Sequence, residues 1–178
     1  MGIPTLISTT TASNAANISI TSGITSSYDE YMFVLTDIGP ATNGVNFFFD
    51  TSTDGGSNYA STATTTYFRA KQTEDNSESE LVYQGGSDLA QGTGGKQLAS
   101  GVGGDADESC AGILHLFSPS DTTYVKHYYG QFSDLQAGEV YDTAFVAGYI
   151  NQTADIDAIK FYFSSGNLDG VVQMYGIA

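Results

Sequence analysis

The chain has 178 residues, 21 of them glycine, and carries a net charge of −15 because 20 acidic residues face only five Lys and Arg. Five scattered cations exclude a nucleic-acid-binding surface, which needs clustered positive charge to displace phosphate counterions, and they disfavour an anionic membrane surface. Aromatic and β-branched residues are too frequent for a disordered chain, and the residues that build helical bundles are too few, so the composition favours an all-β domain.

The first part of the chain reads as short strands separated by turn residues. The candidate strands are residues 3–10, 17–21, 31–35, 45–50 and 64–70. The continuous apolar run at 31–35 is typical of a strand covered on both faces. Asn43-Gly44 is a strong signal for a tight turn before the next strand.

Residues 71–109 change character. This stretch is acidic and rich in Gly-Gly pairs, and only Leu81-Val82-Tyr83 and Leu98 offer apolar anchors. We therefore predict one long loop inserted in the domain. Because it buries little apolar area for each residue ordered, it should be the least ordered part of the isolated chain and should rest on a neighbouring subunit after assembly.

Strand signals return in the second half of the chain. The candidate strands are residues 111–117, 122–132, 143–150, 158–163 and 171–175. No segment has a helical period, and we expect less than about a tenth helix. About nine or ten strands at this spacing predict a single domain over residues 1–178, folded as a two-sheet, jelly-roll-like β-sandwich.

The most specific local motif is Ser52-Thr53-Asp54-Gly55-Gly56-Ser57-Asn58-Tyr59. It resembles the Asp box, Ser-x-Asp-x-Gly-x-Thr-aromatic, with Asn58 in place of Thr and Tyr59 as the aromatic residue. The resemblance implies a structural role for Ser52, Asp54, Gly56 and Tyr59, in which the Asp accepts backbone N–H groups and the ring folds under a hairpin turn.

The same stretch also permits a calcium loop. Asp50, Ser52, Asp54 and Asn58 would supply oxygen ligands, with a glycine at the sixth position. The twelfth position is Ser61, so the bidentate Glu of such loops is missing. The hairpin turn is the favoured interpretation, and no metal or other cofactor is expected.

The sequence offers no catalytic motif, and we expect no enzyme. His115 and His127 lie on consecutive candidate strands and have no local third ligand for zinc. Cys110, the one cysteine, has no basic neighbour in sequence and begins an apolar run, which favours a buried, inert thiol.

Three further segments complete a pattern that is similar to a known group of proteins. They are residues 25–31, which lead into an apolar strand, residues 39–44, and the C-terminal residues 166–177. Together with the Asp-box-like turn they resemble small virion structural proteins of tailed phages, especially marine and cyanobacterial ones. The resemblance implies a β-sandwich, often trimeric, on the outside of a phage particle.

The resulting hypothesis is a non-enzymatic virion surface protein, made in the host cytoplasm. A capsid decoration (cement) protein is the first reading, and a tail-fibre tip or a receptor- or glycan-binding module is the alternative. The expected partners are further copies of the chain in a homotrimer and the major capsid protein or a tail protein. Tyr128, Tyr129 and Phe132 are the interface candidates, because their alternation puts aromatic rings on both faces of one strand. If residues 71–109 cover the second face instead, the chain is a monomer.

Overall fold

The computed structural model describes residues 2–178, which form twelve antiparallel strands and no helix. The strands are β1 (Thr5–Ala15), β2 (Ile18–Ile20), β3 (Glu30–Pro40), β4 (Val45–Ser52), β5 (Ala63–Thr73), β6 (Ser79–Tyr83), β7 (Lys96–Val102), β8 (Cys110–Phe117), β9 (Lys126–Gln136), β10 (Val140–Ile150), β11 (Ala158–Phe163) and β12 (Leu168–Ile177). The all-β prediction is confirmed, with more strands than the nine or ten predicted.

Eight of these strands form a jelly roll of nested antiparallel pairs. The outermost strands pair as β1 with β12 and β2 with β11, and the inner ones pair as β3 with β8 and β4 with β7. The pairs assemble into two facing sheets, β1-β12-β3-β8 and β2-β11-β4-β7. This connectivity confirms the predicted jelly-roll-like sandwich.

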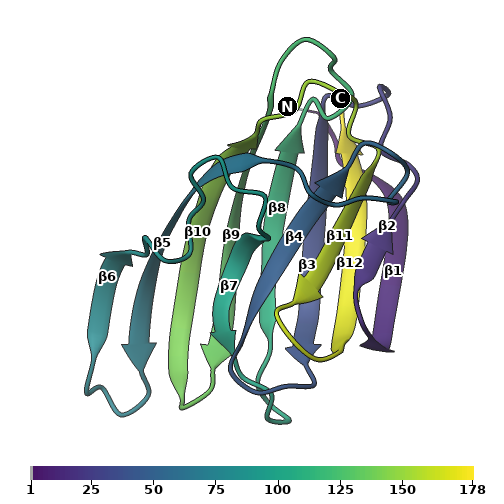
Figure 1. The fold of residues 1–178 in the computed structure, drawn as a ribbon. Coiled ribbons are helices and arrows are strands. Elements are labelled where there is room, and N and C mark those ends of the chain that lie inside the picture. The colour runs from purple at the N-terminus through teal and green to yellow at the C-terminus, as the bar shows by residue number, and fades with distance from the viewer. Residues whose placement is uncertain (1) are drawn as a thin grey trace.

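The other four strands enlarge one sheet only. β9 and β10 continue the first sheet beyond β8, and β5 and β6 follow, so its order is β6-β5-β10-β9-β8-β3-β12-β1. In Figure 1 the smaller sheet lies in front of the larger one, and β5 and β6 project beyond it to the left. The strand ladders of the two sheets are joined at a single residue pair, Val102 in β7 with Gln136 in β9.

The core lies between the two sheets and is built from alternate residues of each strand. Phe33 of β3 contacts Phe161 of β11 with ring centroids 5.7 Å apart, and Phe49 of β4 meets Tyr128 of β9 edge to face at 4.9 Å. All four rings are almost completely buried. Such inter-sheet aromatic pairs add to the free energy of apolar burial and fix how the sheets stack.

The prediction of one long loop over 71–109 is wrong. This stretch contains the end of β5, all of β6 and all of β7, and its loops are limited to shorter segments between them. The apolar anchors seen in the sequence form these strands: residues 81–83 pair with β5, and Leu98 is fully buried in β7. A few apolar residues are enough to form these two strands, because neighbouring strands supply hydrogen-bond partners for their backbone N–H and C=O groups.

The connection from β6 to β7 reaches the outward side of the larger sheet at one end, where Gln91 hydrogen-bonds to Thr64 and Tyr149. It hydrogen-bonds to the start of β5, where Ala63 and Gly92 pair. Near its end, Gly95 packs so closely on Phe48 and Tyr162 of the smaller sheet that a side-chain carbon there would lie 2.9 Å and 2.5 Å from them. The rest of the side that faces away from the core is left exposed to solvent.

Candidate functional site

The exposed face of the eight-stranded sheet is the main candidate surface. Here it is called the outer face and is defined by the outward-pointing residues of β5, β10, β9 and β8. Alternation creates it, because β9 buries Tyr128, Gly130 and Phe132 and leaves the residues between them in solvent. The cross-strand register places Ile113 of β8, Gln131 of β9 and Phe145 of β10 in one row across the sheet.

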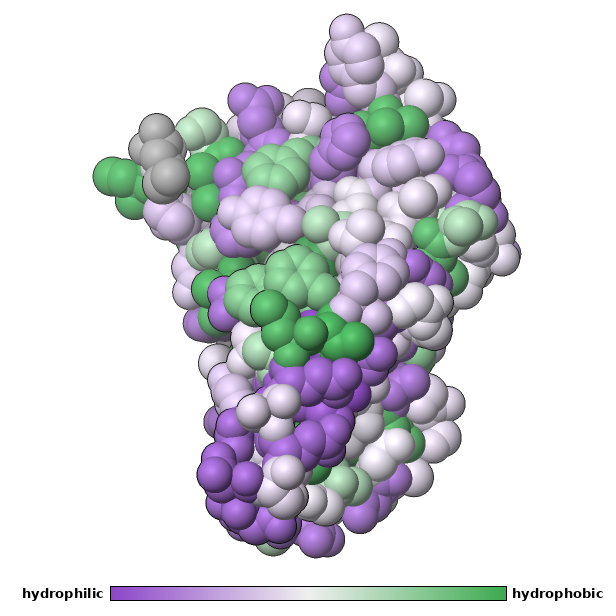
Figure 2. Space-filling model, turned by 90° about the vertical axis from the view of Figure 1, so that its left-hand side faces the viewer, coloured by the Kyte–Doolittle hydropathy of each residue, from purple (hydrophilic) through white to green (hydrophobic). Residues whose placement is uncertain are grey.

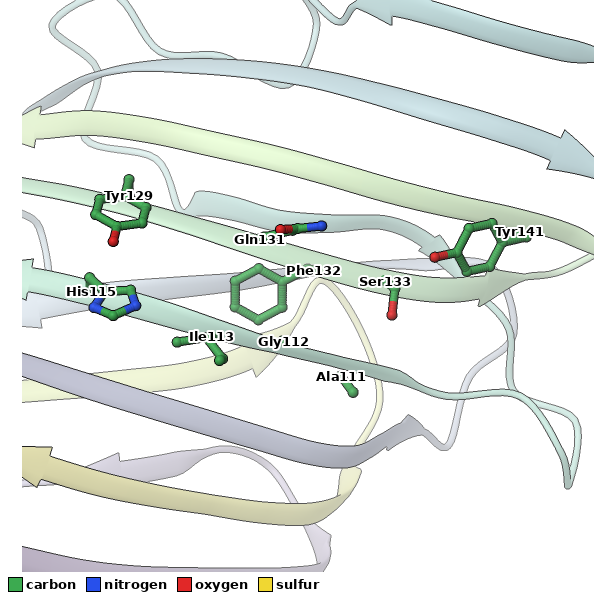
Figure 3. A pocket seen from close by; sticks show the side chains of 9 residues that line it. All are labelled: Ala111, Gly112, Ile113, His115, Tyr129, Gln131, Phe132, Ser133 and Tyr141. Atoms are coloured by element: carbon green, nitrogen blue, oxygen red, sulfur yellow. The ribbon is translucent and has the colours of Figure 1, made fainter. Parts of the chain in front are cut away.

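A shallow trough of about 450 Å³ runs along β8 and β9 on this face (Figure 3). Tyr129 and His115 stand at one end and Tyr141 at the other, as Figure 3 shows. The residues that line it are Ala111, Gly112, Ile113, His115, Tyr129, Gln131, Phe132, Ser133 and Tyr141. The trough therefore combines aromatic ends with a mixed middle, in which Gln131 lies opposite Ile113.

A stack of rings forms the ridge beside the trough. His115 and Tyr129 are opposite each other in the ladder, with centroids 4.7 Å apart and planes 15° apart, and Phe117 continues the stack at 5.7 Å from Tyr129. The Nδ1 of His115 lies 2.5 Å from a carboxylate oxygen of Glu30 on β3. The ridge is thus held in place from two sides, which reduces the side-chain entropy that a binding partner would have to remove.

The outer face is free of formal charge across four strands. Phe68 of β5 and Phe145 of β10 stack at 5.0 Å with planes 10° apart, and Phe68 is still 43% exposed. The outward residues of these strands are Thr64, Thr66, Phe68, Ala70, Gln72, Tyr141, Thr143, Phe145, Ala147, Tyr149, His127, Tyr129, Gln131, Ser133, Leu135, Ala111, Ile113, His115 and Phe117. None of them is Asp, Glu, Lys or Arg. In a chain of net charge −15 this is a marked segregation.

The structure separates the three interface candidates. Tyr129 is 50% exposed on the outer face, but Tyr128 and Phe132 point into the core and are almost fully buried. Their assignment to an interface is therefore wrong for the folded chain. The reason is the period of two: Tyr128 and Phe132 share a face with Gly130, and that face packs on the smaller sheet.

The Asp-box-like segment forms a compact turn in the connection from β4 to β5, but these strands lie in different sheets and do not pair, so the predicted hairpin is wrong. The Asp54 carboxylate accepts hydrogen bonds from the backbone N–H and the side-chain amide of Asn58, at 2.8 and 2.5 Å, and from the Ser52 hydroxyl at 2.7 Å. These bonds, Asn58 foremost, lower the pKa of Asp54 to about 2. Gly55 and Gly56 have φ of 68° and 85°, a region that favours glycine.

The calcium candidates have other partners. The carboxylate of Asp50 lies 2.8 Å from the Nζ of Lys96 and accepts a hydrogen bond from the Tyr162 hydroxyl at 2.7 Å. Ser52, Asp54 and Asn58 bond to one another inside the turn. A cation already neutralises Asp50, so the four residues do not form the calcium loop considered above.

A buried carboxylate pair lies on the inner face of the β9–β10 ladder, directly behind the trough. Asp134 and Asp142 are partners in the ladder and are 3% and 0% exposed. Arg69 of β5 lies 3.0 Å from one oxygen of Asp142, and the amide of Gln136 donates to the same oxygen at 2.8 Å. Both oxygens of Asp134 lack a hydrogen-bond partner within residues 2–178.

Burial and the neighbouring charge make Asp134 a weak acid. Loss of solvation raises its pKa to about 8, with a further contribution from Asp142. Burial also raises the pKa of Asp142, although Arg69 opposes this. One cation between two buried carboxylates leaves Asp134 to be neutralised by a proton near neutral pH. The sequence carried a signal for this pair, since Asp134 continues the inward series Tyr128, Gly130, Phe132.

The remaining reactive side chains are placed apart. Cys110 is buried beside Asp134, and burial raises the pKa of its thiol well above the ordinary value. His115 lies opposite Tyr129, so His127 is not its ladder partner. Within residues 2–178 no three His, Cys, Asp or Glu side chains come together in a way that could hold a metal ion.

Comparisons with known proteins give no family for this chain. No model of a known protein family matches the sequence, and no curated protein matches it significantly. Across the described residues there is also no helix with the length and apolar character needed to span a membrane.

Proposed function

We propose that this chain is a non-enzymatic structural protein of a phage particle surface, and that a capsid decoration protein is the form it takes. The observation that carries the proposal is the outer face, where aromatic side chains are exposed and formal charge is absent over four strands. Exposed apolar patches of this kind mark places where a protein contacts another protein. The resemblance to small virion proteins of tailed phages supports the particle as its site of action.

The side chains on the outer face are suited to contact and not to turnover. In the trough, Figure 3 shows Ser133 toward the end opposite His115. The His115 ring is instead stacked on Tyr129 and paired with Glu30. Asp134 and Asp142, the buried carboxylates with raised pKa values, lie in the core. This arrangement supports a binding role without catalysis.

Quantitative mass spectrometry of purified phage particles that encode the chain tests this proposal. A copy number comparable to that of the major shell protein is expected for a decoration protein. A few tens of copies or fewer would move the protein to the tail. Absence of the chain from purified particles would overturn the proposal, and turnover of host polysaccharide by the isolated chain would overturn its non-enzymatic part.

A specific observation favours a second candidate, a glycan-binding module. Tyr129 and Tyr141 flank the trough, and the side chains of Gln131 and Ser133 between them make no hydrogen bond within residues 2–178. Rings for stacking with free polar groups between them would suit a sugar. Binding of a glycan from an array, lost on Tyr129→Ala but retained with Tyr124→Ala, would support this candidate over the first.

A further inference from the structure

The charges of this molecule are gathered away from the outer face. Glu139, in the β9–β10 turn, lies close enough to carboxylates of two neighbouring connections for them to raise its pKa, with Glu74 contributing most, followed among these groups by Asp107, Glu108 and Asp105. These turns lie at one end of the sandwich. Figure 2, which looks onto the β6 edge, shows that end as hydrophilic and an apolar patch above it. Leu81 and Tyr83 on β6 are large exposed apolar residues of this edge.

We propose that the outer face is the surface through which copies of this chain associate with one another. The inference rests on the proposed structural function and names the partner at that surface. The distribution of charge favours a second copy of the chain as that partner. Each copy carries −15, so close approach through the acidic end would bring carboxylates together, whereas the outer face offers no like charges across β5, β10, β9 and β8. A basic partner would instead be attracted to the acidic end.

The area of the outer face is close to the area that a stable contact with a second copy needs. With strands about 4.8 Å apart and about 3.3 Å per residue, β5, β10, β9 and β8 present about 650 Å², and β6 with the first part of β3 brings the face to about 800 Å². A stable interface buries about 800 Å² on each partner. Toward β3 the face continues with Met32, Val34 and Thr36, and Glu30 is the carboxylate at that side, already paired with His115.

The relief of the face also suits a second copy. A ridge of stacked rings (His115, Tyr129 and Phe117) lies beside the trough, so each copy carries both a projection and a recess. Surfaces that carry both can be self-complementary across a symmetry axis. The polar groups of Gln131 and Ser133, which have no hydrogen-bond partner among residues 2–178, can then hydrogen-bond across the contact.

Light scattering after size-exclusion chromatography over a range of concentrations tests the proposal. The unmodified chain should have a mass that is a multiple of 18.7 kDa. Tyr129→Glu and Gln131→Glu each place a carboxylate on the face and should weaken association about tenfold or more. Gln131→Glu changes an exposed polar side chain by one group and is the variant that leaves folding least affected. Tyr124→Glu is the matched control, because Tyr124 is 71% exposed in the β8–β9 loop, and it should associate like the unmodified chain.

Three outcomes would overturn the inference. They are a mass near 18.7 kDa for the unmodified chain at high concentration, an undiminished assembly mass in folded Gln131→Glu, or an equal loss in Tyr124→Glu. A monomer that binds a glycan at the trough belongs to the first outcome and identifies a sugar as the occupant. Failure here is separable from failure of the proposed function, because a monomer can still be present on particles at high copy number.

Discussion

The two faces of the larger sheet are made by alternate residues of the same strands, yet they reverse the usual distribution of charge. The inner face of β9 and β10 buries two carboxylates, Asp134 and Asp142, together with the Phe132 ring. The outer face exposes Tyr129 and Ile113 and carries no formal charge on these strands. A sheet with one solvated face ordinarily shows polar residues outside and apolar residues inside. This reversed distribution indicates that the outer face is suited to contact with another molecule as well as with solvent.

Removing an aromatic ring from the inner face should lower the free energy of unfolding more than any other substitution considered below. Phe132→Ala leaves a cavity next to Gly112, whose backbone lies against the ring, and should lower the free energy of unfolding by about 3–5 kcal/mol. Urea unfolding of the isolated chain measures this. A loss below about 1 kcal/mol would mean that Phe132 is not part of the core.

The buried carboxylates give the inner face a distinctive pH dependence. The pKa of Asp134 is about 8 in the folded chain against an ordinary 3.8, so between these values the folded chain holds a proton that the unfolded chain has released. Its contribution to stability is therefore fully present below about pH 4 and is lost as the pH rises through about 8. At about 1.4 kcal/mol for each pKa unit, the effect is on the order of a few kcal/mol.

Asp134→Asn isolates this contribution from that of the other carboxylates. The variant should be more stable than the unmodified chain at pH 8, and the difference between the two should shrink toward pH 4. Thermal melting across this pH range provides the measurement. A difference that does not change with pH would show that Asp134 is ionised in the folded chain.

The turn in the connection from β4 to β5 lies outside both faces, and we expect substitutions there to have an intermediate effect. Asp54→Ala removes the acceptor for Asn58 and Ser52 and should lower the free energy of unfolding. Gly56→Val should also destabilise, since φ is 85° and a side-chain carbon would lie 2.7 Å from the Tyr59 hydroxyl. Unchanged melting of both variants would contradict the structural role of the turn, and a large shift on adding calcium would restore the calcium loop.

The smallest effect on folding is expected on the outer face. Tyr129→Ala removes a ring that stacks on His115 but is half exposed, and in dilute solution the free energy of unfolding should change by about 0.5 kcal/mol or less. Urea unfolding at low protein concentration checks this. A loss as large as that for Phe132→Ala would remove the distinction between the two faces.

The period of two in the sequence was sufficient to predict the fold class, because alternation and turn residues report local structure directly. It also indicated aromatic rings on both faces of β9, although it did not show which face would be buried. That choice depends on where the smaller sheet lies, since Tyr128 becomes a core residue only through its contact with Phe49 of β4. Contacts between residues far apart in the sequence determine which face is buried, and the local sequence pattern does not identify those contacts.

The same limit explains the errors over residues 71–109 and the missed carboxylate pair. β6 exists because β5 supplies hydrogen-bond partners to Leu81 and its neighbours, and charge and glycine content conceal that pairing. Asp134 and Asp142 are a pair because the β9–β10 register aligns them. A count of charges could not separate the two buried carboxylates from those in solvent. The absence of charge from the outer face became visible only when the strands were ordered side by side.

Hydroxyl-radical footprinting at low and high protein concentration tests most directly whether the outer face is an association surface. The account predicts that Tyr129 and Ile113, 50% and 40% exposed in the single chain, react readily in dilute solution and become protected as concentration rises. Tyr124 in the β8–β9 loop should react equally at both concentrations. Equal reactivity of Tyr129 and Ile113 at every concentration, or protection of Tyr124 in their place, would contradict the account.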